Sequence, residues 1–235
     1  MAASEDEMRK TILQECDADL AYIFEDGKLR LELQHSIVVA GYTSVKTLVG
    51  LEESRAGMRT VSKEVFGVDS DTPAGRLEVA KLLGIWETCK EHIAKETQIR
   101  AEARALGFTR PATFNEKTSM KKLVEARHGR IPTNETPSSA YVSEKLEEVE
   151  NNEPVASTLD MVASAEDSEA QNIAQSYDSA GRVQMIKKRI KAKMPASPEE
   201  FRCKLRIEGN LWMMLSVKFP NKPYLRDLDP GVFAC

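Results

Sequence analysis

Histidine and cysteine are the side chains with the most versatile chemistry, and this chain contains few of either. The three histidines are His35, His92 and His128, and His92 follows Cys89 by three residues. On a helix this spacing brings the two side chains to one face, where they could share a metal ion. Two ligands do not complete a zinc site, however, and Cys89 lies on an apolar stripe. We therefore expect a core cysteine, and neither a bound metal nor a cofactor.

Other catalytic patterns are missing from the sequence. It contains no G-x-S-x-G nucleophile turn, no Walker-type glycine loop and no dinucleotide fingerprint. Catalytic groups that meet only in the folded chain leave no such local pattern, so an enzyme stays open as an alternative. The sequence nevertheless favours a protein without enzymatic activity.

A run of basic residues stands out in the C-terminal third of the chain. Such a run can contact the backbone phosphates of nucleic acid or direct nuclear import. It can equally be a solvated surface that balances the acidic segment before it, and the lack of interleaved aromatic residues for base stacking favours this alternative. The candidate nucleic-acid contacts are Arg182, Lys187, Lys188, Arg189, Lys191 and Lys193.

The basic run itself can be a strand or a helix. Residues 178–181, directly before it, are typical of a turn. After the turn, Val183 and Met185 alternate as in a strand, whereas Val183, Ile186 and Ile190 recur as in a helix. β-Branched residues after a glycine turn favour a β-hairpin over a helix.

Short helices are predicted for most of the first 130 residues. Ser4 and Glu7 form a capping box, in which each side chain satisfies the backbone N–H of the other residue. Gly41, Gly67 and Gly129 can end helices in a left-handed conformation. Apolar residues at helical spacing predict helices over 29–40, 44–51, 53–66 and 115–128.

The clearest element is a long helix that begins at Pro73, after a cap at Asp71 or Thr72. We expect residues 73–92 to pack in a core, with Trp86 more than half buried. Residues 93–106 should project or dock only lightly, because the apolar stripe thins there while charged i,i+4 pairs continue. The stripe consists of Val79, Leu82, Trp86, Cys89 and Ile93.

Several motifs between residues 20 and 93 occur in a recognisable order. A short helix precedes Gly41-Tyr42, the next ends in LVGL, a third runs into Phe66-Gly67-Val68, and Gly75-Arg76 opens the long helix. In this order they resemble a sterile-alpha-motif (SAM) domain. The resemblance implies a multi-helix domain that binds itself or another protein.

Beyond residue 130 the character of the chain changes twice. Acidic residues dominate 141–180, loop-forming residues surround them, and only 139–149 predict a helix, which should be isolated. Ser197 then caps a helix that leads into the apolar block 211–215, which should be buried. The sequence thus predicts a mostly α fold with a SAM-like helical domain at 1–130, an acidic, partly disordered linker with one helix at 131–175, and a small α+β unit at 176–235 with a basic hairpin and an apolar helix.

Composition and cysteine usage place the protein inside the cell. A net charge of −4 gives no overall attraction to nucleic acid or to anionic membranes. No apolar run approaches the about 20 residues of a membrane span, and the acidic N-terminus does not resemble a signal peptide. Four cysteines without a CxxC pair favour reduced thiols. We expect an intracellular protein, cytoplasmic or nuclear, that does not bind membranes.

A second resemblance covers the whole chain. It rests on the order of GYTSV, the segment 139–147, SPEEFR and an NxxYL segment at 221–225. With these motifs the chain resembles the N-terminal segment of multicopy, retroelement-type reading frames of protists. Asp229-Pro230 begins a helix that stops at Cys235, which predicts a truncated reading frame or a fragment.

Two functions follow from these observations. The first is a non-enzymatic protein-interaction or assembly module that associates with itself or with a protein partner. The alternative is a structural protein of the packaging type that binds nucleic acid weakly through the basic run.

Overall fold

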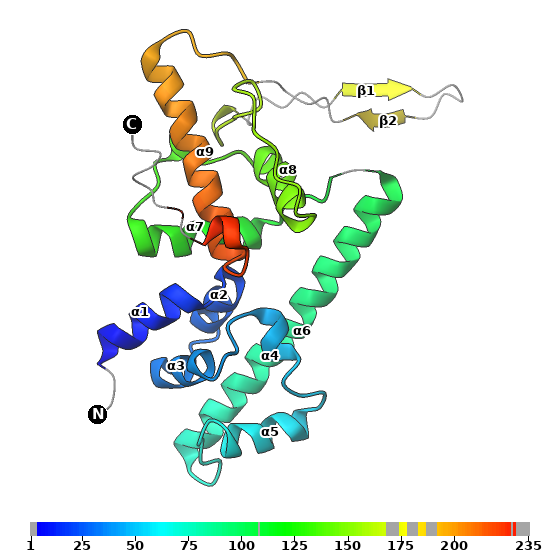
Figure 1. Ribbon diagram of the computed structural model, residues 1–235. Helices are drawn as coiled ribbons and strands as arrows, with labels where there is room; N and C mark the ends of the chain where they lie inside the picture. Colours follow the sequence, from blue (N-terminus) through cyan, green and yellow to red (C-terminus); the bar gives the residue numbers. More distant parts are fainter. Residues whose placement is uncertain are drawn as a thin grey trace.

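α-Helices form most of the described chain, which confirms the predicted mostly helical fold (Figure 1). The computed structural model describes residues 4–107, 109–167, 174–177, 183–186, 192–226 and 228. The first six helices are α1 Glu5–Glu15, α2 Ala18–Asp26, α3 Leu31–Val39, α4 Val45–Val49, α5 Arg55–Glu64 and α6 Pro73–Leu106. They are followed by α7 Phe114–His128, the 3-10 turn η1 Thr133–Glu135, α8 Ser139–Glu150, α9 Pro198–Lys218 and the 3-10 turn η3 Pro223–Leu225.

Polar side chains set where these helices begin. Ser4 forms the predicted capping box with Glu7 at the start of α1. Thr72, and not Asp71, caps α6, and Ser197 caps α9. A cap accepts a hydrogen bond from a backbone N–H that has no partner within the helix, so these residues fix helix starts that apolar periodicity alone leaves uncertain.

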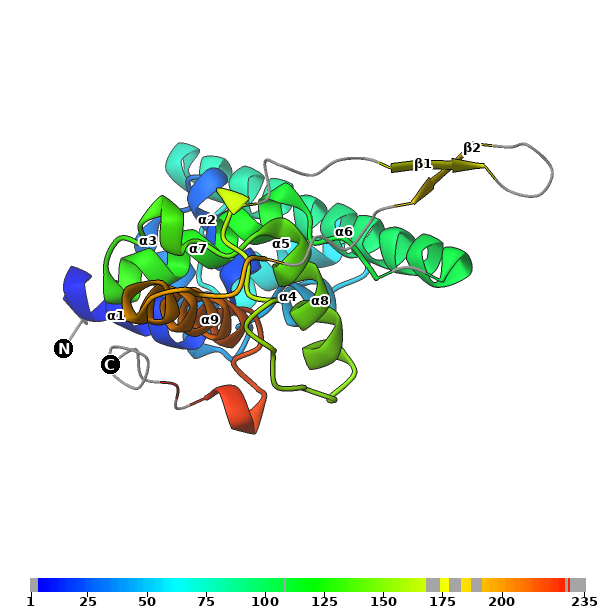
Figure 2. The same ribbon diagram turned by 90° about the horizontal axis from the view of Figure 1, so that it is seen from above.

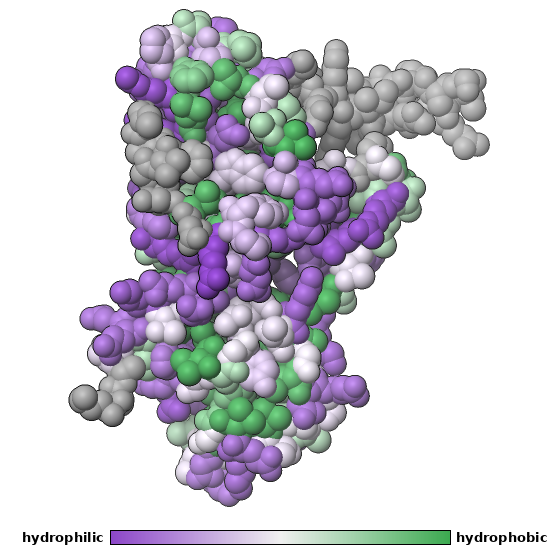
Figure 3. Space-filling model, viewed as in Figure 1, coloured by the Kyte–Doolittle hydropathy of each residue, from purple (hydrophilic) through white to green (hydrophobic). Residues whose placement is uncertain are grey.

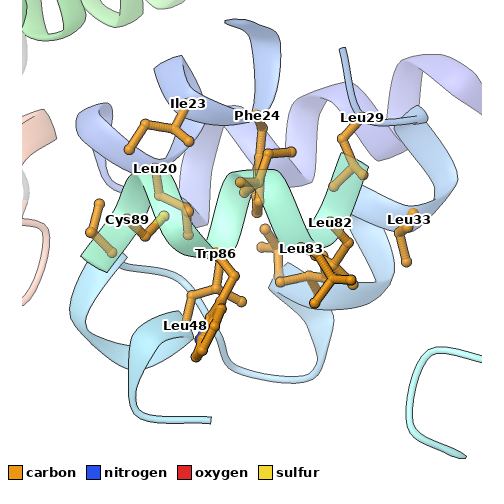
Figure 4. Packing of buried hydrophobic residues seen from close by; sticks show 14 of the residues in the cluster. Leu20, Ile23, Phe24, Leu29, Leu33, Leu48, Leu82, Leu83, Trp86 and Cys89 are labelled. Carbon is orange, nitrogen blue, oxygen red and sulfur yellow. The ribbon is translucent and has the colours of Figure 1, made fainter. Parts of the chain in front are cut away.

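The first of two hydrophobic cores lies among α1 to α5 and the first half of α6; we refer to it as the N-terminal core (Figure 4). Trp86 is only 2 % exposed there, and Leu82 and Cys89 on the same helix are fully buried. The predicted burial of Trp86 is therefore confirmed. Other large side chains buried in this core are Leu20, Phe24, Ile37, Leu48 and Met58.

The second core, the C-terminal core, is built mainly by α7, α8 and α9. The apolar block 211–215 of α9 contributes Leu211, Met214 and Leu215, which are fully buried as expected from the sequence. Helix α7 supplies Met120 and α8 supplies Leu146. Ala18, at the beginning of α2, also belongs to this core, so α2 borders both cores.

Helix α6 runs beside both cores (Figure 1). Its 34 residues span about 50 Å at 1.5 Å per residue. The part of α6 after residue 92 is mostly exposed. It is fastened to α8 by a hydrogen bond of 2.9 Å from Arg100 Nη2 to Glu150 Oε1. Neither α6 nor any other helix in the described part of the chain combines the length and the apolar character of a membrane span.

The two cores do not coincide with the limits predicted at residues 130 and 175. Helix α8 was expected to be isolated, but Tyr141, Val142 and Val149 are buried in the C-terminal core. That expectation is wrong, because two of the acidic residues that suggested a solvated linker, Glu148 and Glu150, are used in ion pairs. Glu148, for example, binds the buried Lys145 at 2.8 Å.

The segment after α8 is also attached to the C-terminal core. The backbone N–H of Ser138 donates to the carbonyl oxygen of Ala163 at 2.9 Å. The ammonium of Lys204 on α9 donates to the carbonyl oxygen of Val162 at 2.7 Å. Both contacts hold the described part of the predicted linker against its neighbours in the fold.

Two short strands, β1 Ala174–Tyr177 and β2 Val183–Ile186, pair antiparallel and lie away from the helices in both ribbon views (Figures 1 and 2). In their register Ala174 faces Ile186 and Tyr177 faces Val183. Most of the basic residues around β2 lie outside the described residues. The basic hairpin therefore stays a prediction.

Candidate functional site

The residues that the sequence singled out do not meet in one site. Cys89 is fully buried in the N-terminal core, and His92, one turn further on, turns instead towards Asp19. Five of the six basic candidates, Arg182, Lys187, Lys188, Arg189 and Lys191, lie outside the described residues, and the sixth, Lys193, is exposed. Among the described residues, no cluster of three or more His, Cys, Asp or Glu side chains is placed to hold a metal ion.

A group of buried or half-buried charged side chains lies instead where the two cores meet. We call it the charged junction. It connects α2, α6, α7, α8 and α9 through side chains that are far apart in the sequence. Its carboxylates are Asp19, Glu96, Glu116 and Glu150, and its basic groups are His92, Arg100, Arg110 and Lys218.

Lys218, at the end of α9, bridges two carboxylates. Its ammonium donates to Asp19 Oδ2 at 2.6 Å and to Glu116 Oε1 at 2.8 Å. Asp19 lies on α2 and Glu116 on α7, so a single lysine joins three helices. The other oxygen of Asp19 accepts a hydrogen bond from Ser119 Oγ at 2.7 Å.

Arg110 likewise bridges two carboxylates, Glu116 and Glu150. Its guanidinium grips Glu116 with two hydrogen bonds of 2.9 Å, the two-point geometry that makes arginine–carboxylate pairs strong. It also donates to Glu150 at 3.0 Å, and Glu150 accepts a further bond from Arg100 at 2.9 Å. The loop before α7 is thereby tied to α6 and α8.

The pKa values show how strongly these pairs hold their charges. Burial on its own opposes ionisation of Glu116, but the hydrogen bond from Arg110 and the charge of Lys218 lower its pKa to about 2. Burial likewise opposes ionisation of Asp19, and the charge of Lys218 overcomes it and holds the pKa of Asp19 well below its usual range. In return, Asp19 and Glu116 raise the pKa of the buried Lys218 against the effect of its burial.

Two groups at the edge of the junction have raised pKa values. The Nε2 atom of His92 lies 3.6 Å from Asp19 Oδ2, and this contact raises the pKa of His92. Asp17 caps α2 by accepting the N–H of Leu20 at 2.7 Å. Removal from bulk water and the nearby charge of Asp19 raise the pKa of Asp17 to about 7, although its side chain keeps some exposure.

A cavity of about 440 Å³ opens next to the junction, between α2, α4, α6 and the end of α9. Figure 3 shows a hollow on this face, between the part of the molecule that holds the N-terminal core and the part that holds the C-terminal core. Asp19 and His92 line this cavity and also a second one of about 160 Å³. The charged groups that line the larger cavity are Asp17, Asp19, Lys46, His92, Glu96, Lys218 and Lys222.

This arrangement is better suited to binding charge than to nucleophilic catalysis. A carboxylate–histidine pair can activate a hydroxyl or thiol when that group hydrogen-bonds to the imidazole. Among the described residues the contact found for the His92 imidazole is with Asp19, which Lys218 and Ser119 already hold. The fixed charges therefore pair with one another between the helices, and Asp19, His92, Glu96 and Lys218 also line the cavity.

The sequence gives little sign of this junction, because its members are distant in the chain. Only Lys218 has a neighbourhood in the sequence that suggests burial. It is the last residue of α9 and stands between the apolar residues Val217 and Phe219. A lysine in such a place is rarely buried without an acidic partner. The sequence contains nothing that names Asp19 and Glu116 as those partners.

The comparisons with known proteins add no relative to this description. No family model matches the chain, and the searches of curated proteins and of solved structures found no similar protein.

Proposed function

We propose that the protein is a non-enzymatic interaction or assembly module that associates through its N-terminal helices. The observation that carries this proposal is an exposed apolar surface at the ends of α3 and α5. Val39 is 65 % exposed and Val65 is 53 % exposed. In Figure 3 hydrophobic residues gather over α3 and α5 on the part of the molecule that holds the N-terminal core.

An aromatic contact links these two helix ends. Tyr42, three residues after Val39, packs edge-on against Phe66, with ring centroids 6.1 Å apart. Phe66 directly follows Val65, so the contact joins the chain after α3 to the end of α5. Scattered apolar side chains are normal on a protein surface, whereas a gathered set favours a contact with another protein.

The resemblance of residues 20–93 to a SAM domain supports the same proposal, since it implies a domain that binds itself or a second protein. We take a second copy of the chain as the first partner to test.

Light scattering over a range of protein concentrations tests self-association. The variant carrying Val39→Lys and Val65→Lys should shift the protein towards the monomer. Lysine at these two positions also suits the end of a helix, so α3 and α5 should be retained. Val155→Lys is the matched control, because Val155 is 59 % exposed and lies after α8. A parent protein that is monomeric at every concentration, or a double variant that behaves as the control does, would contradict self-association through this surface.

A second candidate function, weak nucleic-acid binding of the packaging type, rests on the basic run. Lys193 is exposed in the described chain, directly after the buried Ala192. The N–H of Ala192 donates to the carbonyl oxygen of Asp160 at 2.7 Å, which anchors this end of the run to the folded part of the chain. The salt dependence of RNA binding, described in the Discussion, tests this function.

A further inference from the structure

The larger cavity beside the charged junction has an imbalance of charge. Within the junction four carboxylates face four basic groups when His92 is protonated, so these groups neutralise one another. Two further lysines, Lys46 and Lys222, line the cavity without belonging to the junction. Their charges decide what the cavity attracts.

Neither lysine has a carboxylate partner in the described part of the chain. Lys46 on α4 is exposed at the cavity. Lys222, four residues after the end of α9, donates a hydrogen bond to the side-chain oxygen of Asn152, which carries no charge. Lys46 and Lys222 therefore line the cavity from the two parts of the molecule that contain the separate cores, and the ammonium of Lys222 lies at Asn152.

Asp17 is the acid that opposes them. The carboxyl of Asp17 is partly neutral around neutral pH, because burial and the neighbouring Asp19 raise its pKa to about 7. Below that pH the lining of the cavity carries excess positive charge. The charged groups around Asp17 in the cavity are Asp19, Lys46, His92, Glu96, Lys218 and Lys222.

We propose that this cavity binds a small phosphorylated molecule, whose phosphate lies between Lys46 and Lys222. Lysine ammonium groups bind phosphate as mobile point charges, and two of them match the charge of a phosphate monoester. Asn221 in the cavity wall offers a further hydrogen-bond donor. A volume of about 440 Å³ is within the usual range of small-molecule sites. The bound phosphate would bridge α4 and the end of α9, and would thereby hold the two cores together.

Phosphorus NMR with inorganic phosphate as the probe tests the proposal on the 235-residue chain. The titration is run at pH 6.5 and constant ionic strength. We expect saturable binding to the parent protein, about tenfold weaker in Lys46→Gln and in Lys222→Gln, because each loses one charge-assisted contact. Lys95→Gln is the matched control, since Lys95 is an exposed lysine on α6 that does not line the cavity. The variant Lys187→Gln, Lys188→Gln, Arg189→Gln separates this site from the basic run, and it should bind phosphate as the parent does.

Sulfate serves as a second probe, because its charge does not change with pH in this range. Its affinity should fall from pH 6 to pH 8 in the parent and fall less in Asp17→Asn, where asparagine keeps the helix cap without gaining a charge. Four results would overturn the proposal. The first two are that phosphate binding does not saturate, or that neither cavity lysine variant changes the affinity. The third is that the pH dependence of sulfate binding is equal in Asp17→Asn and the parent. The fourth is that the lysine variants weaken binding of a single-stranded oligonucleotide but not of phosphate.

Discussion

The two cores of this protein are assembled from the chain in opposite ways. The N-terminal core takes its members from residues 12–89, on six consecutive helices. The C-terminal core joins α7 and α9, which are separated by 69 residues of the chain. Lys218 reaches carboxylates 102 and 199 residues away in the sequence. Apolar burial stabilises wherever the pattern of side chains is right, whereas a buried charge is stable only when its partner is in place. The first core therefore depends on local pattern, and the second also depends on the charged junction.

The largest effect is expected at the junction. Lys218→Met removes the cation that Asp19 and Glu116 share and leaves two buried carboxylates without it. Breaking a buried ion pair from one side costs about 3 to 5 kcal/mol, and the upper end applies here because two partners are affected. Urea unfolding followed by circular dichroism measures the loss. Lys95→Met, the same change at an exposed site, should have little effect, and an equally small loss for Lys218→Met would show that the junction contributes little.

A loss of unfolding free energy of similar size, but with a different cause, is expected in the N-terminal core. Trp86→Ala leaves a cavity beside Leu82 and Cys89, and truncation of a buried aromatic costs about 3 to 5 kcal/mol. The indole Nε1 of Trp86 has no hydrogen-bond partner in the described chain, so the loss should come from packing and from the contact of the ring with the Lys90 ammonium, which lies 4.3 Å from the ring centroid. Trp86→Phe should restore most of the free energy of unfolding. Failure of phenylalanine to do so would contradict a packing role.

The contributions of the two cores to the free energy of unfolding should respond differently to acid. A carboxyl whose pKa is lowered by folding stabilises the protein above its ordinary pKa, and this contribution is lost as the pH falls towards the folded value. For Glu116 the interval runs from 4.5 down to about 2, and the loss is about 3 kcal/mol. Asp19 acts in the same direction. The free energy of unfolding, measured from pH 5 to pH 2, should show this slope in Trp86→Ala. The slope should be smaller in Lys218→Met, where Arg110 still holds Glu116, and equal slopes would rule out Lys218 as a source of it.

The smallest effect concerns the basic run. If it binds nucleic acid, affinity for RNA should fall steeply with salt, because each neutralised phosphate releases counterions. Replacement of Lys187, Lys188 and Arg189 by Gln should reduce the log–log slope by about two to three units without unfolding the protein. Filter binding at several salt concentrations measures the slope. No binding at low salt, or an unchanged slope, would leave the run as a solvated surface.

The same contrast explains what the sequence could and could not predict. Helix starts were predictable where one residue decides them, as Ser4 and Ser197 do, and the stripe through Trp86 identified a buried face. The packing of α8 was not predictable, because its acidic residues look solvated until Lys145 and Arg110 are placed beside them. Long-range ion pairs leave no periodic signal, so the junction and its cavity could be found only in the fold.

The chain carries one tryptophan for each core, Trp86 in the N-terminal core and Trp212 packed against the C-terminal core. Trp212→Phe and Trp86→Phe therefore give two proteins whose fluorescence reports one core each. If the charged junction couples the cores, the two urea transitions should coincide, and adding Lys218→Met to each protein should separate them, with the C-terminal core unfolding first. Transitions that differ already with Lys218 in place, or that remain coincident without it, would contradict coupling through the junction.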